Sequence, residues 1–235
     1  CVRGGYGSAR LLNEIDYDLI RNNPKIFIGM SDVTALHLAI NKFCNLVTFL
    51  GQHANITLNS IIKDNNHYMW NNLLSIIQED NKDYCYEFSH IDESKKCVKT
   101  VSPGIAKGKT IGGNLTLIIN SCGTPWQIET VNKILIIEDI GIKPYQLDRM
   151  LNQLKQCGLL QDVAGVIFGC FVGDEDIETE NSYTIDEVID NYFIDAKFPV
   201  IKNFPTGHLL REQVILPLNV NIELDGDNCR VRLLE

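Results

Sequence analysis

An apolar run that ends in Gly-x-Ser and passes at once into a helical pattern is the feature that most constrains the fold of this chain. Residues 26–29 read Ile-Phe-Ile-Gly and predict a buried strand, and residues 32–42 carry apolar side chains at helical spacing. Ser31 lies in the turn between them. Such a turn holds a serine hydroxyl out at the end of a sheet, beside the free N–H groups of a helix N-terminus. Ser31 is therefore either a nucleophile or the N-cap of the helix, and this fragment alone favours neither.

The residues around Ser31 match a known pattern in part. Gly29 removes a side chain where a sharp turn is crowded. Val33 stands where the common Gly-x-Ser-x-Gly turn has its second glycine. An isolated serine is a poor nucleophile, so the nucleophile interpretation requires a base elsewhere in the chain.

The neighbouring segments predict an α/β fold. A strand at 46–50 follows the helix and completes a βαβ-like unit, and a Gly-rich loop and a helix from about Ala9 precede it. A parallel sheet this small cannot bury both of its faces. We therefore expect further strands before Cys1, and an N-terminal doubly wound domain of the Rossmann or flavodoxin type that lacks its first strands in this chain.

A polar stretch divides the sequence. Asn, Asp, Lys and Glu are dense from 60 to 110, where one helix is expected over 68–78. We expect an N-terminal domain over 1–85, a surface connector over 86–105 and a C-terminal domain over 106–235. The alternative interpretation of the polar stretch is a disordered insertion.

The second half regains alternating strands and helices. Strands are expected at 133–137, 163–169 and 199–201. Helices are expected at 115–120 and 145–157. Gly158 is expected to end the last of these helices, and Asp225-Gly226 predicts a hairpin turn. The C-terminal domain is therefore expected to be α/β with a β-rich tail.

Composition excludes some classes of function. The net charge is −9 at pH 7, which argues against nucleic acid or an anionic membrane as a partner. No apolar run is long enough to span a bilayer. The eight cysteines form no C-x-x-C pair and no histidine stands at zinc-finger spacing. We expect reduced structural thiols in a reducing compartment, and no metal.

His208 is the best candidate for the base. It lies in a loop just past the strand at 199–201, and α/β proteins place functional groups in loops at the carboxyl ends of strands. The other histidines are weaker candidates. They are His37 (helix face or core), His53 (after a strand end, where it could line the site), and His67 and His90 (both in the polar stretch).

Glu138 is a candidate for the group that orients the base. It ends the buried run at 134–137, and a carboxylate in that position is costly unless it is paired. Holding a histidine in the correct tautomer is such a pairing. Asp139 is the rival for this role, and a solvated acid at a strand end is the plainer alternative.

The loop from Arg3 to Ser8 contains three glycines and has two interpretations. A Gly-rich loop before a helix can hold a phosphate, although a single loop of this kind is a weak signal. It can also form an oxyanion hole, in which backbone N–H groups face the oxygen of a scissile carbonyl.

Taken in order, these motifs resemble the LD-carboxypeptidases, a family of serine peptidases. The motifs are Arg3-Gly4-Gly5-Tyr6-Gly7, Asn23-Pro24-Lys25, residues 29–37, Gly112-Gly113-Asn114-Leu115, Ile137-Glu138-Asp139 with Tyr145 and Asp148-Arg149, and Gly207-His208. The resemblance runs from residue 3 to about 217 and is weakest over 60–105. Met30 replaces the tyrosine usual before the nucleophile, and the family has further elements before the Gly-rich loop.

The resemblance implies a Ser–His–Glu triad in which Ser31 is the nucleophile, His208 the base and Glu138 the orienting acid. It implies oxyanion donors from the backbone of Asp32 and of the Gly4-Gly5 loop, with Gly5 the expected glycine. Candidates for contact with the substrate are Arg3, Gly4, Tyr6 and His53. The resemblance implies no metal and no cofactor. It implies that the protein is a homodimer in the cytoplasm.

The implied substrate is a small muropeptide. Family members hydrolyse the amide between an L-configured diamino-acid centre and a terminal D-alanine in murein tetrapeptides, as part of peptidoglycan recycling. The first alternative is a related branch that cleaves a microcin-type peptidyl nucleotide and confers immunity. The second alternative, from another class, is a non-catalytic α/β protein that binds an anion through the Gly-rich loop.

Overall fold

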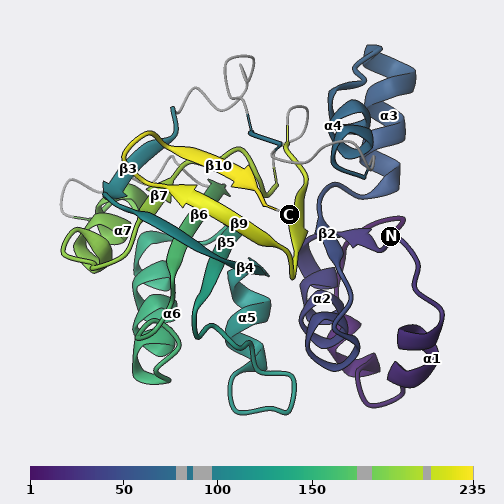
Figure 1. Ribbon diagram of the computed structural model, residues 1–235, viewed down its shortest axis with the longest axis horizontal. Helices are drawn as coiled ribbons and strands as arrows, with labels where there is room; N and C mark the ends of the chain where they lie inside the picture. Colours follow the sequence, from purple (N-terminus) through teal and green to yellow (C-terminus); the bar gives the residue numbers. More distant parts are fainter. Residues whose placement is uncertain (78–83, 87–96, 174–181, 209–212, 235) are drawn as a thin grey trace.

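Two β-sheets form the frame of the structure, a computed structural model that describes residues 1–77, 84–86, 97–173, 182–208 and 213–234. One sheet has three strands in the order β1-β2-β8, and the other has seven in the order β10-β9-β4-β5-β6-β7-β3. Figure 1 shows α5, α6 and α7 beside the larger sheet, with α2 and the pair α3 and α4 on the side of the smaller one. The predicted α/β fold class is confirmed.

The smaller sheet carries the strand–turn–helix of the opening motif. β1 (Ile28–Gly29) and β2 (Thr48–Leu50) are parallel, as the βαβ-like pattern predicts, and both are shorter than expected. The third strand, β8 (Leu216–Leu218), pairs antiparallel with β2 and comes from the far end of the sequence. The smaller sheet therefore joins both halves of the chain.

The helices of the first half differ from the prediction in three places. The helix expected from Ala9 is only a 3-10 turn, η1 (Ser8–Leu11), and α1 (Tyr17–Asn22) follows with Asp16 as its N-cap. The helix expected over 32–42 consists of η2 (Ser31–Val33), α2 (Thr34–Ala39) and η3 (Ile40–Cys44). α3 (Ala54–Asp64) was not predicted, whereas α4 (Tyr68–Ile77) matches the helix expected over 68–78.

Four adjacent parallel strands form the centre of the larger sheet. They are β4 (Ile105–Asn114), β5 (Lys133–Ile140), β6 (Gly165–Val172) and β7 (Val200–Lys202). The helices that connect them are α5 (Leu115–Ser121), α6 (Pro144–Gln156) and α7 (Ile185–Phe193). Gly158 ends α6 with a φ of +74°, as predicted. In this arrangement the carboxyl ends of β4 and β5 meet at one edge of the sheet, where α/β folds place their ligands.

Antiparallel strands complete both edges of the larger sheet. β9 (Asn221–Asp225) and β10 (Arg230–Leu233) form the hairpin predicted from Asp225-Gly226. β3 (Lys99–Ser102) pairs with β7 at the other edge. β3 and β4 were not predicted, and β3 falls within the range expected to be a connector. Residues 87–96 of that range lie outside the described residues, as does His90.

Alternate residues of the central strands fill two separate cores. Leu135 and Ile137 of β5 belong to the core that includes α5, α6 and α7, and Ile134 and Ile136 belong to the core that includes Phe204 and the C-terminal strands. Because both faces are buried, β5 appears in the sequence as an unbroken apolar run. No helix in the described part of the chain is long and apolar enough to cross a membrane.

Candidate active site

Ser31 lies at a strained turn between β1 and η2. Its φ of +59° falls in the left-handed region that non-glycine residues rarely adopt. Met30 is the N-cap of η2 and no side chain caps this helix, so Ser31 is not its cap. A Cβ on Gly29 would lie 2.6 Å from Cγ1 of Val33, which explains the glycine before the turn.

His37 of α2 supports this turn through a hydrogen bond. It is fully buried, and its Nε2 lies 2.8 Å from the carbonyl oxygen of Gly29. Burial lowers the pKa of His37 to about 4, so the ring is neutral near pH 7 and Nε2 donates to Gly29. His37 is a buried core histidine on α2, as expected.

The carboxylate of Asp32 holds the Gly-rich loop against the turn. Oδ1 accepts a hydrogen bond from the amide of Gly7 at 3.2 Å, and Oδ2 accepts from the amide and the hydroxyl of Ser8 at 2.8 and 2.7 Å. Asp32 is buried, so water competes weakly for these bonds. The side chain of Asp32 therefore fixes the loop, a role that the sequence did not suggest.

Gly4 brings the loop close to Ser31. A Cβ on Gly4 would lie 2.7 Å from Cε1 of His53 and 3.3 Å from Cβ of Ser31. His53 is itself buried, and its Nε2 lies 3.1 Å from the carbonyl oxygen of Met30. Burial lowers the pKa of His53, and the nearby His208 lowers it further. The structure thus places Gly4, Ser31 and His53 together.

The remaining residues of the loop are open to solvent. Gly5 adopts a φ of +148°, and no atom lies within 4 Å of the position its Cβ would take. Tyr6 is 92% exposed, and Arg3 is exposed with its Nε donating to the carbonyl oxygen of Gly4 at 3.5 Å. These side chains are not packed against the turn in the structure.

His208 pairs with Glu138. Nδ1 of His208 lies 2.7 Å from Oε2 of Glu138, whose side chain is fully buried near the end of β5. Two glycines make room for this carboxylate. A Cβ on Gly207 would lie 2.9 Å from Oε2, and one on Gly169 would lie 3.0 Å from Cβ of Glu138. The side chain of His208 is 15% exposed, so its ring is reachable from solvent.

Asp139 has other partners. Its carboxylate accepts hydrogen bonds from Nδ2 of Asn114 at 2.8 Å and from the amide and hydroxyl of Thr116 at 2.9 and 2.8 Å. These bonds tie the end of β5 to the first turn of α5. Of the two neighbouring acids, the structure places Glu138, not Asp139, on His208.

Glu138 is held in an environment that opposes its charge. Burial raises the pKa of Glu138, while the hydrogen bond and the charge of His208 act in the opposite direction. Its second oxygen, Oε1, has no hydrogen-bond partner among the described residues. A carboxylate hydrogen-bonded to a histidine in this way holds the ring in one tautomer and orientation.

The contact between the two halves of the chain depends on residues whose roles the sequence did not reveal. The backbone N–H of Asn114, at the end of β4, donates a hydrogen bond to Oγ1 of Thr34 at 3.0 Å. A Cβ on Gly113 would lie 2.6 Å from the same oxygen. The Gly-Gly-Asn motif before α5 was visible in the sequence, but its partner Thr34 was not.

The structure offers little for a metal. Among the described residues, no group of three or more His, Cys, Asp or Glu side chains is arranged to hold a metal ion. All eight cysteines are free thiols. Of the remaining histidines, His67 is exposed and lies 3.4 Å from Oδ1 of Asn65.

Two family models match the chain. The LD-carboxypeptidase N-terminal domain matches residues 1–51, and the LD-carboxypeptidase C-terminal domain matches residues 107–224. A curated relative, the probable murein peptide carboxypeptidase of Bacillus subtilis (strain 168), is 40% identical over 209 residues, which are 88% of this chain and 62% of that protein. The chain thus spans about three fifths of the length of this relative.

Two solved structures have a fold similar to that of this chain. A muramoyltetrapeptide carboxypeptidase from Oxalobacter formigenes matches with a TM-score of 0.81 at 26% identity, over 99% of this chain and 76% of that one. MccF in complex with glutamyl sulfamoyl guanosine matches with a TM-score of 0.85 at 26% identity, over 100% of this chain and 74% of that one.

Proposed function

The chain belongs to the LD-carboxypeptidase family, and we propose that it provides the serine-peptidase site of an enzyme that releases terminal D-alanine from murein tetrapeptides. The single observation that carries the chemistry is the 2.7 Å contact between Nδ1 of His208 and Oε2 of Glu138. The substrate class is supported by the similarity to a probable murein peptide carboxypeptidase and to a muramoyltetrapeptide carboxypeptidase.

The roles in the proposed triad follow from this contact. Glu138 accepts a hydrogen bond from Nδ1–H of His208, which leaves Nε2 as the nitrogen that takes a proton from a nucleophile. Ser31 is the proposed nucleophile because its positive φ presents a side chain at a sharp strand–helix turn. Gly4 lies beside both Ser31 and His53, and His208 is near enough to His53 to lower its pKa, which supports placing Ser31 and His208 in one site.

In the proposed reaction, Oγ of Ser31 attacks the carbonyl carbon of the amide before the terminal D-alanine, and His208 takes the serine proton. The oxyanion of the tetrahedral intermediate faces the backbone N–H groups of Asp32 and Gly5. His208 then returns the proton to the leaving amine of D-alanine, and water, activated by the same ring, hydrolyses the acyl-enzyme. Glu138 stabilises the imidazolium that forms in both steps.

The test is release of D-alanine from a murein tetrapeptide by the full-length protein. We expect Ser31→Ala to reduce the rate by at least about 10³-fold, because the nucleophile is lost while the oxyanion donors remain. Ser182→Ala, at an exposed serine, is the matched control and should retain full activity. Undiminished release by Ser31→Ala, with its fold intact, would contradict the nucleophile assignment.

A second candidate function is hydrolysis of an aminoacyl or peptidyl nucleotide. The observation that favours it is the similarity to MccF in complex with glutamyl sulfamoyl guanosine. A competition assay between a murein tetrapeptide and an aminoacyl sulfamoyl nucleoside separates the two functions, because the preferred substrate suppresses turnover of the other. A third, non-catalytic function would leave Ser31 unlabelled by a fluorophosphonate probe.

The setting of the enzyme is also part of the proposal. Free cysteines are typical of reducing compartments, which supports a cytoplasmic location. We also propose that the protein is a homodimer and that the chain divides into a domain over 1–85, a connector over 86–105 and a domain over 106–235. Sedimentation of the full-length protein at two concentrations tests the dimer.

A further inference from the structure

A polar pocket lies between the two halves of the chain at the end of β5 opposite to Glu138. It has a volume of about 240 Å³. Residues of α2 and η3 line one side, and residues in the middle of β4, before and at the start of β5, and just after β8 line the other. Lys133 begins β5, so about 16 Å of strand separates this pocket from Glu138. The pocket is therefore distinct from the proposed active site.

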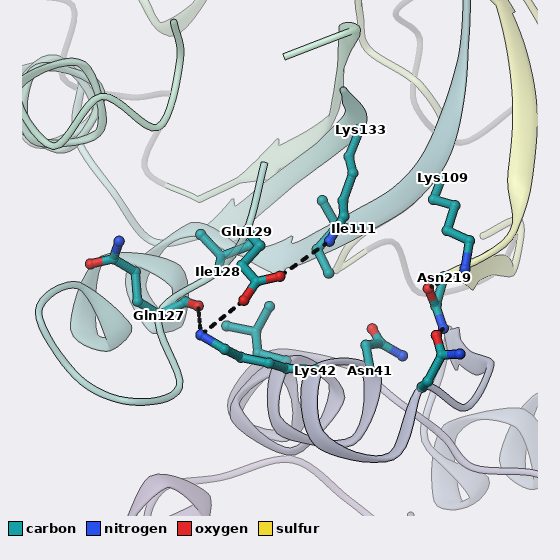
Figure 2. Close-up of a pocket in the computed structure, with 11 residues that line it drawn as sticks. Asn41, Lys42, Lys109, Ile111, Gln127, Ile128, Glu129, Lys133 and Asn219 are labelled. Carbon is teal, nitrogen blue, oxygen red and sulfur yellow. Dashed lines mark hydrogen bonds and ion pairs between the residues drawn. The ribbon is translucent and has the colours of Figure 1, made fainter. Parts of the chain in front are cut away.

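Three lysines surround the pocket. Lys109 and Lys133 are paired residues on the adjacent strands β4 and β5, and Lys42 approaches from η3. Figure 2 shows Lys42 coming from the helical side and Lys109 and Lys133 from the strands. Like charges at paired positions of neighbouring strands destabilise a sheet unless a counter-charge is present.

One carboxylate, that of Glu129, pairs with two of the three ammonium groups. Glu129 lies 3.2 Å from Nζ of Lys42 and 3.9 Å from Nζ of Lys133. Nζ of Lys109 has only a neutral partner among the described residues, Oδ1 of Asn219 at 3.2 Å. Three positive charges against one negative charge leave an excess of two, in a chain whose net charge is −9.

The electrostatics of Lys133 reflect this excess. Burial lowers the pKa of Lys133, Glu129 acts in the opposite direction, and Lys109 and Lys42 lower it further. The lysines therefore repel one another across the pocket. A dianion placed between them would remove the repulsion.

The helical side of the pocket contributes an unused acceptor. Asn41 is buried, and its Nδ2 donates to the carbonyl oxygen of Leu46 at 2.9 Å and to Oγ1 of Thr48 at 3.1 Å. These bonds fix the amide orientation and leave Oδ1 without a partner among the described residues. In Figure 2 this oxygen points up toward the strands. An unsatisfied buried acceptor is unfavourable, and a ligand hydroxyl in the pocket would supply the missing donor.

We propose that this pocket binds a small phosphate monoester that carries a hydroxyl group. The phosphate dianion lies among the ammonium groups of Lys42, Lys109 and Lys133, since lysine binds phosphate as a point charge. The ligand hydroxyl donates to Oδ1 of Asn41, and the carbon chain lies on Leu38 and Ile111. The proposal does not depend on the proposed function, because it uses none of the residues of the triad.

The test is thermal unfolding and calorimetric titration with glycerol 3-phosphate. The ionic strength is held constant, so that the screening of surface charges is the same with and without the ligand. We expect Tm to rise by about 2–4 °C at roughly five times the dissociation constant, since the ligand binds only the folded chain. Lys109→Gln/Lys133→Gln should weaken binding at least ten-fold, while Lys155→Gln, an exposed lysine on α6, should not change it. Absence of any rise in Tm, or an equal rise in the double variant, would overturn the proposal.

Two further measurements sharpen the result. Inorganic phosphate lacks the hydroxyl-bearing chain, so it should bind more weakly than the ester; equal binding would overturn assignment of the ester. Without ligand, the double variant should unfold at the same or a higher temperature, because two repelling charges are gone. If the double variant does not fold, Lys109→Gln alone gives the same comparison, because its ammonium has no carboxylate partner among the described residues.

Discussion

Oδ2 of Asp32 accepts hydrogen bonds from both the amide and the hydroxyl of Ser8. This relationship ties the Gly-rich loop to the residue that follows Ser31 in the chain. The backbone amide of Asp32 is one of the proposed oxyanion donors, and the loop supplies the other. One residue therefore sets the distance between the two donors, and preorganised donors are the largest contribution to catalysis in many hydrolases.

Asp32→Asn should lower kcat for release of D-alanine by about 10- to 100-fold with a smaller effect on KM. The reason is that an amide NH₂ replaces one of the two oxygens that the N–H groups of Gly7 and Ser8 require. Asp162→Asn, at an exposed acid, is the matched control. An equal rise in KM with unchanged kcat would instead assign the loop to substrate binding.

The neighbouring acids Glu138 and Asp139 make a matched pair. Glu138→Gln should reduce kcat by about 10³- to 10⁴-fold, because the amide keeps the shape but cannot stabilise the imidazolium of His208. Asp139→Asn should retain much more activity and lose about 1–2 kcal/mol of unfolding free energy, because it weakens the bonds to Asn114 and Thr116. Steady-state kinetics and urea unfolding of both variants check this, and the reverse order would exchange the two roles.

Stability should fall as the pH drops below about 6.5. The pKa of His37 is about 4 in the folded chain and 6.5 in the unfolded chain, so the unfolded state binds the proton more readily between these values. The contribution is complete above pH 6.5 and is lost progressively toward pH 4, and it amounts to roughly 3 kcal/mol. His53, whose pKa is also lowered by burial, adds to it in the same direction.

Urea unfolding from pH 7.5 to 4.5 measures this dependence. His37→Gln keeps a donor for the carbonyl oxygen of Gly29 but does not titrate, so its slope with pH should be smaller than that of the parent chain. His67→Gln, at an exposed histidine, should leave the slope unchanged. Equal slopes for all three proteins would show that His37 is not the source.

Gly4→Ala should abolish most of the activity. The new methyl group would lie 2.7 Å from Cε1 of His53, so the loop must move away from Ser31. Adding His53→Ala to Gly4→Ala removes the obstructing ring and should restore part of kcat. No recovery in the double variant would indicate that His53 has a role beyond packing.

Strong local patterns predicted their elements well. The unbroken apolar run of β5 and the Gly158 that ends α6 were both correct, because burial on two faces and a left-handed cap leave clear marks in sequence. β4 was missed because lysines and glycines interrupt its apolar pattern. β8 lies within the expected β-rich tail but was not predicted as a separate strand, because Pro217 lies inside it and proline argues against a strand.

The residues of the candidate site were predictable from the sequence, but the contacts that hold them in place were not. Ser31, Glu138 and His208 are each marked by local context, a turn or a strand end, and so appear as candidates from sequence. The bonds from Ser8 to Asp32 and from Asn114 to Thr34 join residues far apart in the chain. No periodicity records such pairs, so they required the structure.

The pairing of β8 with β2 affects how the chain emerges during synthesis. Asn45 and Asn219, which flank the two strands and share a hydrogen bond, are 174 residues apart, so β2 leaves the ribosome long before its partner exists. During that interval, the edge of β2 that later pairs with β8 has no partner strand. Because His208 precedes β8 in the chain, the sheet that carries Ser31 gains its third strand only after the last member of the proposed triad has been made.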